Sequence, residues 1–267
     1  MTVAIIVVPS VTRLPPEADG AVIVGGSHAA LYAAHVVAKA GARAAIHHDA
    51  GIGFEEAGVA GLALAQELGM AMAAVDSASA RIGEAEDMMR RGIVRRANAL
   101  AAACGVAPGQ TCAEAAERLK AAPWPHRAPP ARAEGRSVFD AKAGRRKIIC
   151  IDSATLILAE DRDQVVATGS HGAEVSGQVV APVEPALVLY NDAGFGADRA
   201  GAAGLLILDK AGVAGATVAA LSAKIGDGRS TLTRGVLSAV NEAAYRLGGR
   251  VGGSALALAR LVAEKAG

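Results

Sequence analysis

The chain has 267 residues, with 27 Lys and Arg against 26 Asp and Glu, and a formal net charge of +1 at pH 7. This balance excludes electrostatic recruitment to nucleic acid or to an anionic membrane, so we expect a small-molecule partner. The N-terminus lacks the basic region of a signal peptide, and no apolar run reaches the ~18 residues that span a bilayer. Cys104, Cys112 and Cys150 show no CxxC spacing, which predicts free thiols and a cytoplasmic protein.

The sequence contains a tandem duplication of one α/β unit. Residues 1–105 align with residues 144–248 without a gap, each position having its counterpart 143 positions later. Roughly a third of the paired positions are identical, which chance does not produce over this length. We therefore predict an N-terminal repeat at residues 1–105, a linker at 106–143 and a C-terminal repeat at 144–267, arranged as a pseudo-dimer.

Short apolar runs alternate with helical patterns along both copies. In the first copy the runs predict strands at residues 3–8, 21–25, 42–47 and 71–75, with helices between them. In the linker, residues 111–121 predict a short helix. The Pro-rich, basic stretch that follows is typical of an exposed connection.

The second copy repeats this order and predicts one long final helix. The expected strands are residues 147–152, 164–168, 185–190 and 216–221, and the expected helices are 172–181, 197–211 and 230–247. Gly235 and Asn241, with their counterparts Gly92 and Asn98, would lie inside that last helix as contact points. Strands without polar alternation predict parallel sheets covered on both faces, hence two tandem Rossmann-like repeats of the α/β class.

Polar residues that both copies retain follow the predicted strands. Because the carboxyl ends of parallel strands meet at one edge of a sheet, where open α/β folds bind ligands, we expect these residues to share a site. Ser10 and Thr12, with Ser153 and Thr155, join this edge if the first strand is also parallel. The retained segments are Gly26-Ser27-His28 and Gly169-Ser170-His171 after the second strand, Asp49 to Gly53 and Asp192 to Gly196 after the third, and Ser79 to Glu84 and Ser222 to Asp227 after the fourth.

Ser170, His171 and Asp192 are the candidate catalytic residues, with Ser27, His28 and Asp49 as their first-copy counterparts. The histidine would act as general acid or base, the aspartate would orient it from the adjacent loop, and the serine would be a nucleophile or a donor to an oxyanion. Each has a structural alternative, since the serine fits a helix N-cap and the aspartate fits a tight turn.

The remaining candidates would bind the substrate. Lys224 and Arg81 would clamp a carboxylate or phosphate beside the helix N-termini. The others are Asn191, Gly194, Gly196, Ser222, Asp227 and Ser79. The second copy has the more glycine-rich loops, which let backbone approach a ligand, so it is the preferred site. The hypothesis is an enzyme that hydrolyses or otherwise transforms an acyl or amide group of a small anionic metabolite.

Two other classes of function stay open. Asp49 and Asp192 follow Gly26 and Gly169 at about the distance that separates a dinucleotide glycine loop from its ribose-binding acid, although the GxGxxG motif is missing. A non-catalytic small-ligand module is the other class, and it or the enzyme could form homo-oligomers. The residues identify no cofactor. A metal held by His28, His47, His48 and Asp49 would not be common to both copies, which place Tyr190 and Asn191 opposite His47 and His48.

The combination GSHG, NDAGxG, (R/K)IGDG and GV(I/L)SxVN resembles a bacterial family of uncharacterised proteins. The resemblance covers the second copy from Ile148 to about Gly249 and, more loosely, the first. It implies a common architecture for the two copies and carries no implication about the substrate.

Overall fold

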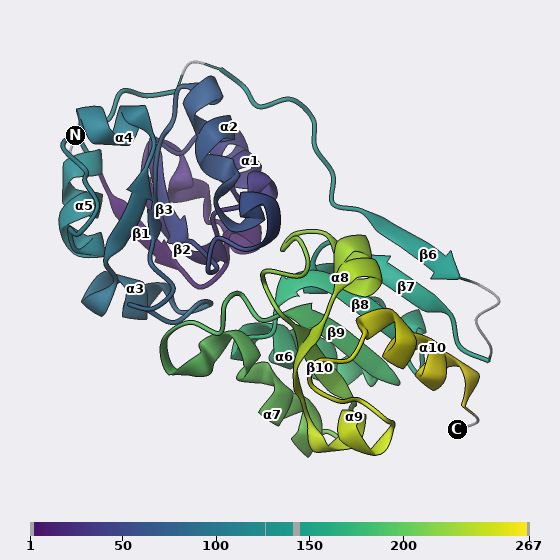
Figure 1. Cartoon of the computed structure of the whole chain (residues 1–267). Helices are drawn as coiled ribbons and strands as arrows, with labels where there is room; N and C mark the ends of the chain where they lie inside the picture. Colours follow the sequence, from purple (N-terminus) through teal and green to yellow (C-terminus); the bar gives the residue numbers. More distant parts are fainter. Residues whose placement is uncertain (1–2, 126, 141–144, 266–267) are drawn as a thin grey trace. The chain divides into compact units, whose positions relative to one another are not determined.

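The computed structural model describes residues 3–125, 127–140 and 145–265, and the chain divides into two compact units (Figure 1). Unit 1 comprises Met1–Ile52, Glu56–Arg132 and Gly196–Asp198, and unit 2 comprises Gly53–Glu55, Ala133–Phe195 and Arg199–Gly267. Each unit therefore includes one short segment from the other half of the sequence. The two exchanged segments are counterparts in the duplication.

Unit 1 contains a five-stranded sheet in the order β1-β2-β3-β4-β5. The strands are β1 (Ile5–Val8), β2 (Val22–His28), β3 (Ala44–His48), β4 (Ala71–Val75) and β5 (Val94–Ala97). The first four are parallel to their neighbours, and β5 pairs with β4 in the antiparallel sense. The four strands expected in this copy are thus confirmed, and β5 is an addition.

Unit 2 has the same sheet with one more strand. Its order is β11-β10-β9-β8-β7-β6, with β7 to β10 parallel and both edge strands antiparallel. The strands are β6 (Arg136–Asp140), β7 (Ile148–Ile151), β8 (Val165–His171), β9 (Leu187–Asn191), β10 (Gly215–Val218) and β11 (Leu237–Val240). The predicted α/β class with two mostly parallel sheets is confirmed.

Alternate residues of each parallel strand enter different cores, because both faces of the sheet are covered. In unit 1, Val22 and Val24 pack against α3 (Ala85–Arg91), α4 (Ala99–Ala103) and α5 (Cys112–Leu119). Ile23 packs on the opposite face against α1 (Leu31–Lys39) and α2 (Gly61–Leu68). Figure 1 shows the strands of unit 1 between these two groups of helices. In unit 2 the faces are covered by α6 (Glu174–Val180) and α7 (Gly204–Lys210) on one side, and by α8 (Gly228–Arg234), α9 (Glu242–Arg246) and α10 (Ala255–Glu264) on the other.

The strand order is sequential, and this bears on where a ligand can bind. When each right-handed crossover leads to the next strand in the same direction, consecutive helices lie on the same face of the sheet. The helices α1 and α2 lie on one face in this way. In a doubly wound sheet, the ligand crevice opens where the strand order reverses. Among the described strands neither parallel series reverses, so any site at the carboxyl edge has to be formed by the loops themselves.

The predicted long helix at residues 230–247 is wrong. The chain forms α8, then the antiparallel strand β11, then α9. Gly235 ends α8 in extended backbone, and a Cβ there would collide with the carbonyl oxygen of Thr231 and with Val218. Asn241 begins α9, since its side chain accepts a hydrogen bond from Ala244 N–H. Gly92 and Asn98 have the same roles in unit 1.

The expected linker at residues 106–143 also differs from the structure. Its predicted helix exists as α5, but Cys112, Leu119 and their neighbours are part of the unit 1 core. Residues 136–140 form β6 and pair with β7. The helix α10 begins 143 positions after α5, so the structural repeat extends beyond the region where the sequences align. Residues 126 and 141–143 of that segment lie outside the described part of the chain.

Replacing Asn241 by Ala is expected to lower the free energy of unfolding by about 2–4 kcal/mol. The Asn241 amide accepts from Gly215 N–H at 3.0 Å and from Ala244 N–H at 2.9 Å, and donates to Val213 O at 2.8 Å, so truncation leaves three buried backbone groups unpaired. Urea unfolding followed by circular dichroism measures the change. Ser254→Ala, which removes one exposed capping bond of α10, serves as control and should cost about 1 kcal/mol. Equal losses in the two variants would contradict this interpretation of Asn241.

Candidate functional site

The Gly-Ser-His segment of each copy is a bulge at the end of a strand, not the loop that the sequence indicated. In unit 2 the pairing of β8 with β9 jumps from Ala167 opposite Leu189 to His171 opposite Asn191. Two extra residues on β8 therefore leave the ladder, and β2 repeats the same shift against β3. Bulges of this kind redirect side chains and are frequent beside active sites.

The bulge turns the serine toward the loop that follows the first strand. Ser170 Oγ accepts a hydrogen bond from Ala154 N–H at 2.9 Å, and Ser27 Oγ accepts one from Val11 N–H at 3.2 Å. The expected alternative role as N-cap of the next helix is wrong, because Ala173 and Ala30 occupy those caps. Since a hydroxyl that accepts keeps its own hydrogen, Ser170 retains a donor.

Two further hydroxyl groups lie on the same turn. Ser153 Oγ and Thr155 Oγ1 are 2.8 Å apart and flank Ala154, whose N–H holds Ser170. Because β7 and β8 are parallel, this turn lies at the carboxyl edge, as expected for Ser153 and Thr155. Ser10 and Thr12 form the same pair in unit 1, at 3.0 Å.

The glycine of the Gly-Ser-His segment serves backbone packing. Gly226 N–H donates to Gly169 O at 2.7 Å, and a Cβ on Gly169 would come within 2.6 Å of Gly226 C and of Asp152 O. Gly83 and Gly26 make the same contact in unit 1. The retained glycines thus allow the loop after the fourth strand to cross over the second. This contact accounts for them without a bound phosphate.

The aspartate of the next motif holds two loops together. Asp192 Oδ1 accepts from Gly194 N–H at 2.8 Å and from Ala220 N–H at 2.9 Å. Asp49 Oδ1 accepts from Gly51 and Ser77 in the same way. Gly194 has φ of +72° and Gly196 has φ of +66°, so both supply the left-handed backbone of this turn. Only the second carboxylate oxygen, Oδ2, is left for another partner.

Asn191 also has a structural role, which His48 fills in unit 1. Asn191 Oδ1 accepts from Ala193 N–H, and its Nδ2 donates to Ala223 O at 3.1 Å. His48 Nδ1 accepts from Ala50 N–H, and its Nε2 is 3.0 Å from Ala80 O. The amide and the neutral imidazole therefore satisfy equivalent backbone groups. This equivalence explains how the two residue types exchange between the copies.

Unit 1 has two fully buried histidines at the end of β3. Burial lowers the pKa of His47 to about 4, against a weaker opposing effect of its hydrogen bond to Gly25 O. Burial also lowers the pKa of His48. The pKa of His28 falls to about 4 through desolvation, with His47 and His48 adding to the effect. The described residues contain no group of three or more His, Cys, Asp or Glu able to hold a metal ion.

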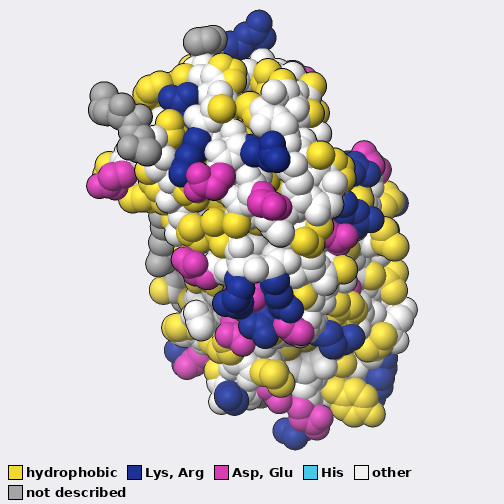
Figure 2. Space-filling view, turned by 90° about the vertical axis from the view of Figure 1, so that its left-hand side faces the viewer, with side chains coloured by type: hydrophobic (Ala, Val, Ile, Leu, Met, Phe, Trp, Pro, Cys, Tyr) yellow, Lys and Arg dark blue, Asp and Glu magenta, His cyan; other side chains and the backbone are white. Residues whose placement is uncertain are grey.

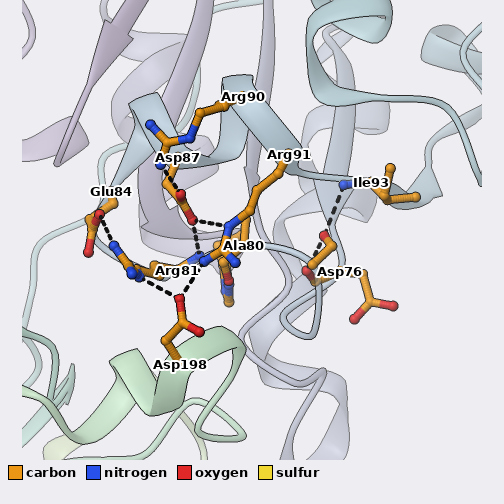
Figure 3. Close-up of polar contacts among 11 residues, drawn as sticks. Asp76, Ala80, Arg81, Glu84, Asp87, Arg90, Arg91, Ile93 and Asp198 are labelled. Carbon is orange, nitrogen blue, oxygen red and sulfur yellow. Dashed lines mark hydrogen bonds and ion pairs between the residues drawn. The ribbon is translucent and has the colours of Figure 1, made fainter.

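The two candidate anion clamps are engaged in ion pairs. Arg81 pairs with Glu84 at 3.3 Å and with Asp198 at 2.8 Å, and these hydrogen bonds, that of Asp198 first, raise the pKa of the guanidinium (Figure 3). Lys224 pairs with Glu55 at 2.5 Å. A substrate anion would have to compete with these carboxylates for either cation.

Figure 3 also shows that Asp87 organises the loop that carries Arg81. Asp87 accepts from Arg81 N–H at 3.0 Å and from the side chains of Arg90 and Arg91. Burial alone would raise the pKa of Asp87, but these hydrogen bonds together lower it. In unit 2 the counterpart is neutral, since Ser230 Oγ accepts from Lys224 N–H.

The remaining candidates hold the loop after the fourth strand. Ser222 Oγ donates to Ala219 O and accepts from Val236 N–H, and Ser79 does the same with Asp76 and Ile93. Asp227 is the N-cap of α8, so a carboxylate already lies at that helix N-terminus. Ser222, Ser79 and Asp227 therefore have structural roles that the sequence did not indicate.

Sequence reasoning missed one difference between the copies. Arg95 Nη1 lies 3.2 Å from Asp49 Oδ2, which neutralises that buried carboxylate. The counterpart of Arg95 is Ser238, and in the described part of the chain Asp192 has no ion pair. The sequence contained a signal for this difference, because the alignment of the two copies pairs Arg95 with Ser238.

Comparisons with protein-family models, with curated proteins and with solved structures gave no match. The family resemblance noted from the motifs therefore stays a prediction. Among the described residues, no helix combines the length and apolar character required to cross a bilayer. On the face drawn in Figure 2, basic and acidic side chains are interspersed.

We predict that unit 1 loses stability as the pH falls from about 6.5 to about 4. A histidine whose folded pKa lies below its unfolded value binds a proton only in the unfolded chain over that range, so acid favours unfolding. For His47 the full difference is about 3 kcal/mol. The single tryptophan, Trp124, belongs to unit 1, so its fluorescence during urea unfolding at pH 7 and pH 5 reports on this unit.

The double variant His47→Leu/His48→Asn removes two of the three histidines whose pKa burial lowers, and the asparagine is the residue that unit 2 uses. Its urea midpoint should fall less between pH 7 and pH 5 than that of the original chain, because His28 is the one histidine of the three that remains. If the variant keeps the full acid sensitivity of the original chain, His47 and His48 are not its source.

Proposed function

We propose that the chain is an enzyme that transforms an acyl or amide group of a small metabolite, by hydrolysis or by acid–base chemistry. The site would be the carboxyl edge of the unit 2 sheet. The observation that carries the proposal is the duplicated bulge, which holds Ser170 Oγ 2.9 Å from Ala154 N–H directly before His171. The three free thiols suit the cytoplasm as the compartment of this reaction.

His171 is suited to donate a hydrogen bond to a substrate oxygen. Its Nδ1 lies 3.4 Å from Ala173 N–H and accepts from it, so the neutral ring carries its hydrogen on Nε2. With 7% of the residue exposed, the ring is largely withdrawn from water, which strengthens a hydrogen bond to developing negative charge. We assign His171 as the hydrogen-bond donor and electrostatic stabiliser of an acyl oxygen.

Ser170 is assigned as the nucleophile or as a second donor to the same oxygen. Its hydroxyl accepts from one backbone N–H and keeps a hydrogen that a base can remove. Ser153 and Thr155 would add polar contacts to the substrate from the adjacent turn. An anionic group on the substrate remains part of the proposal, and it would replace Glu55 as the partner of Lys224.

Turnover of small chromogenic acyl compounds tests the proposal, with p-nitrophenyl acetate and acetyl p-nitroanilide as probes. His171→Ala should lower kcat/KM by about 10²–10³, the range for removing one hydrogen-bond donor to developing negative charge. Its matched control is His28→Ala, the same change in the first copy, which should leave kcat/KM within about threefold. Circular dichroism verifies that both variants are folded.

Ser170→Ala and its control Ser27→Ala then separate the two chemical routes. Loss of turnover in Ser170→Ala alone supports a covalent intermediate. Retained turnover in Ser170→Ala with loss in His171→Ala supports acid–base chemistry without one. Turnover by the original chain that does not exceed that of a Ser170→Ala/His171→Ala double variant contradicts the proposed activity.

A further inference from the structure

The first copy contains a cation bound to its motif carboxylate. Arg95, on β5, places Nη1 at 3.2 Å from Asp49 Oδ2 and at 3.7 Å from Asp76 Oδ1. Asp49 is fully buried, whereas the Arg95 side chain is 44% exposed. The guanidinium thus reaches the buried carboxylate from the surface of the unit.

The second copy preserves the backbone frame of this contact. Thr217 pairs with Ala239 and Val218 with Leu237, at the same positions as Ala74 with Arg96 and Val75 with Val94 in unit 1. The two backbone hydrogen bonds to the Asp Oδ1 atom are also the same in both units. Asp192 Oδ2 is therefore the counterpart of the Asp49 oxygen that Arg95 contacts.

The residues that surround the guanidinium in unit 1 are small and neutral in unit 2. Ser238 replaces Arg95, and Ala219 replaces Asp76. Ser238 Oγ is 2.9 Å from Thr217 Oγ1, so its short side chain bonds to the neighbouring strand. Ser238 and Ala219 are both partly exposed, so the residues that replace Arg95 and Asp76 reach the surface of unit 2.

Asp192 itself is only 3% exposed, and within the described residues it has no cationic partner. The arginine on its own loop, Arg199, stacks over the Phe195 ring at 4.0 Å instead. A buried carboxylate without a countercharge is costly, so this position favours a cation from outside the protein.

We propose that unit 2 binds the guanidinium or ammonium group of a small ligand at Asp192 Oδ2, in the position that Arg95 occupies in unit 1. The ligand is then a cationic or zwitterionic metabolite, and its charged nitrogen anchors it at the edge that carries Ser170 and His171. The binding assigned here does not depend on the proposed reaction. In this proposal Asp192 binds the cationic group of the ligand and does not orient His171.

Methylguanidinium chloride is the probe, with methylammonium chloride as a second cation and sodium chloride as the ionic-strength control. Backbone amide NMR of the full chain, at 26.6 kDa, resolves the two units. The signals of Gly194 and Ala220, whose N–H groups contact Asp192, should shift saturably with the organic cations. Those of Gly51 and Ser77 in unit 1 should follow the sodium chloride control.

Three variants test whether binding follows the residues that differ between the two units. Ser238→Arg supplies the guanidinium from the chain and should abolish the saturable shifts. Asp192→Asn keeps the Oδ1 acceptor but removes the charge, and should weaken binding about tenfold or more. Arg95→Ser/Asp76→Ala gives unit 1 the residues of unit 2 and should produce new saturable shifts at Gly51 and Ser77.

The absence of saturable shifts at Gly194 and Ala220 in the original chain overturns this inference, as does unchanged binding in Ser238→Arg. Thermal unfolding of each variant verifies its fold before titration. Because the readout is binding, a chain that binds methylguanidinium but turns over no acyl probe contradicts only the proposed reaction. A chain that turns over the probe without binding the cation contradicts only this inference.

Discussion

One carboxylate oxygen in each unit holds the carboxyl edge of the sheet together. Asp192 Oδ1 joins the loop after β9 to the loop after β10, and Asp49 Oδ1 does the same between β3 and β4. The loop after β10 also contacts the bulged end of β8, since Gly226 N–H donates to Gly169 O directly before Ser170. A charged acceptor of two backbone N–H groups is stronger than a neutral one, which explains why both copies keep an aspartate at this point.

Much of the fold was readable from the sequence. The apolar runs LVLY in β9 and AMAAV in β4 are each followed by a polar residue, and this pattern predicts buried parallel strands. The prediction of a single helix at residues 230–247 failed because LSAVNEAAYRL has the composition of a helix, whereas its first residues form β11. Only tertiary pairing with β10, and the caps at Gly235 and Asn241, decide between the two structures.

The sequence predicted the location of the candidate site better than it predicted the roles of the individual residues. Parallel strands bring their following loops to one edge, so the grouping of Ser170, Asp192 and Lys224 loops followed from strand order alone. The bulge in β8 and the crossing of Gly226 over Gly169 did not follow, since both depend on contacts between residues far apart in the chain. Those contacts turn several polar candidates into parts of the scaffold.

Comparison of the two copies therefore distinguishes three kinds of position. Residues that are identical in both copies, such as Gly169 and Asp192, make the same backbone contacts in both, so identity chiefly marks what the frame requires. Exchanges such as His48 for Asn191 preserve those contacts with another side chain. The replacement of Arg95 by Ser238 is of a third kind, because it removes a partner and leaves a charge behind. Within a shared frame, an uncompensated difference of this sort points to chemistry that only one copy performs.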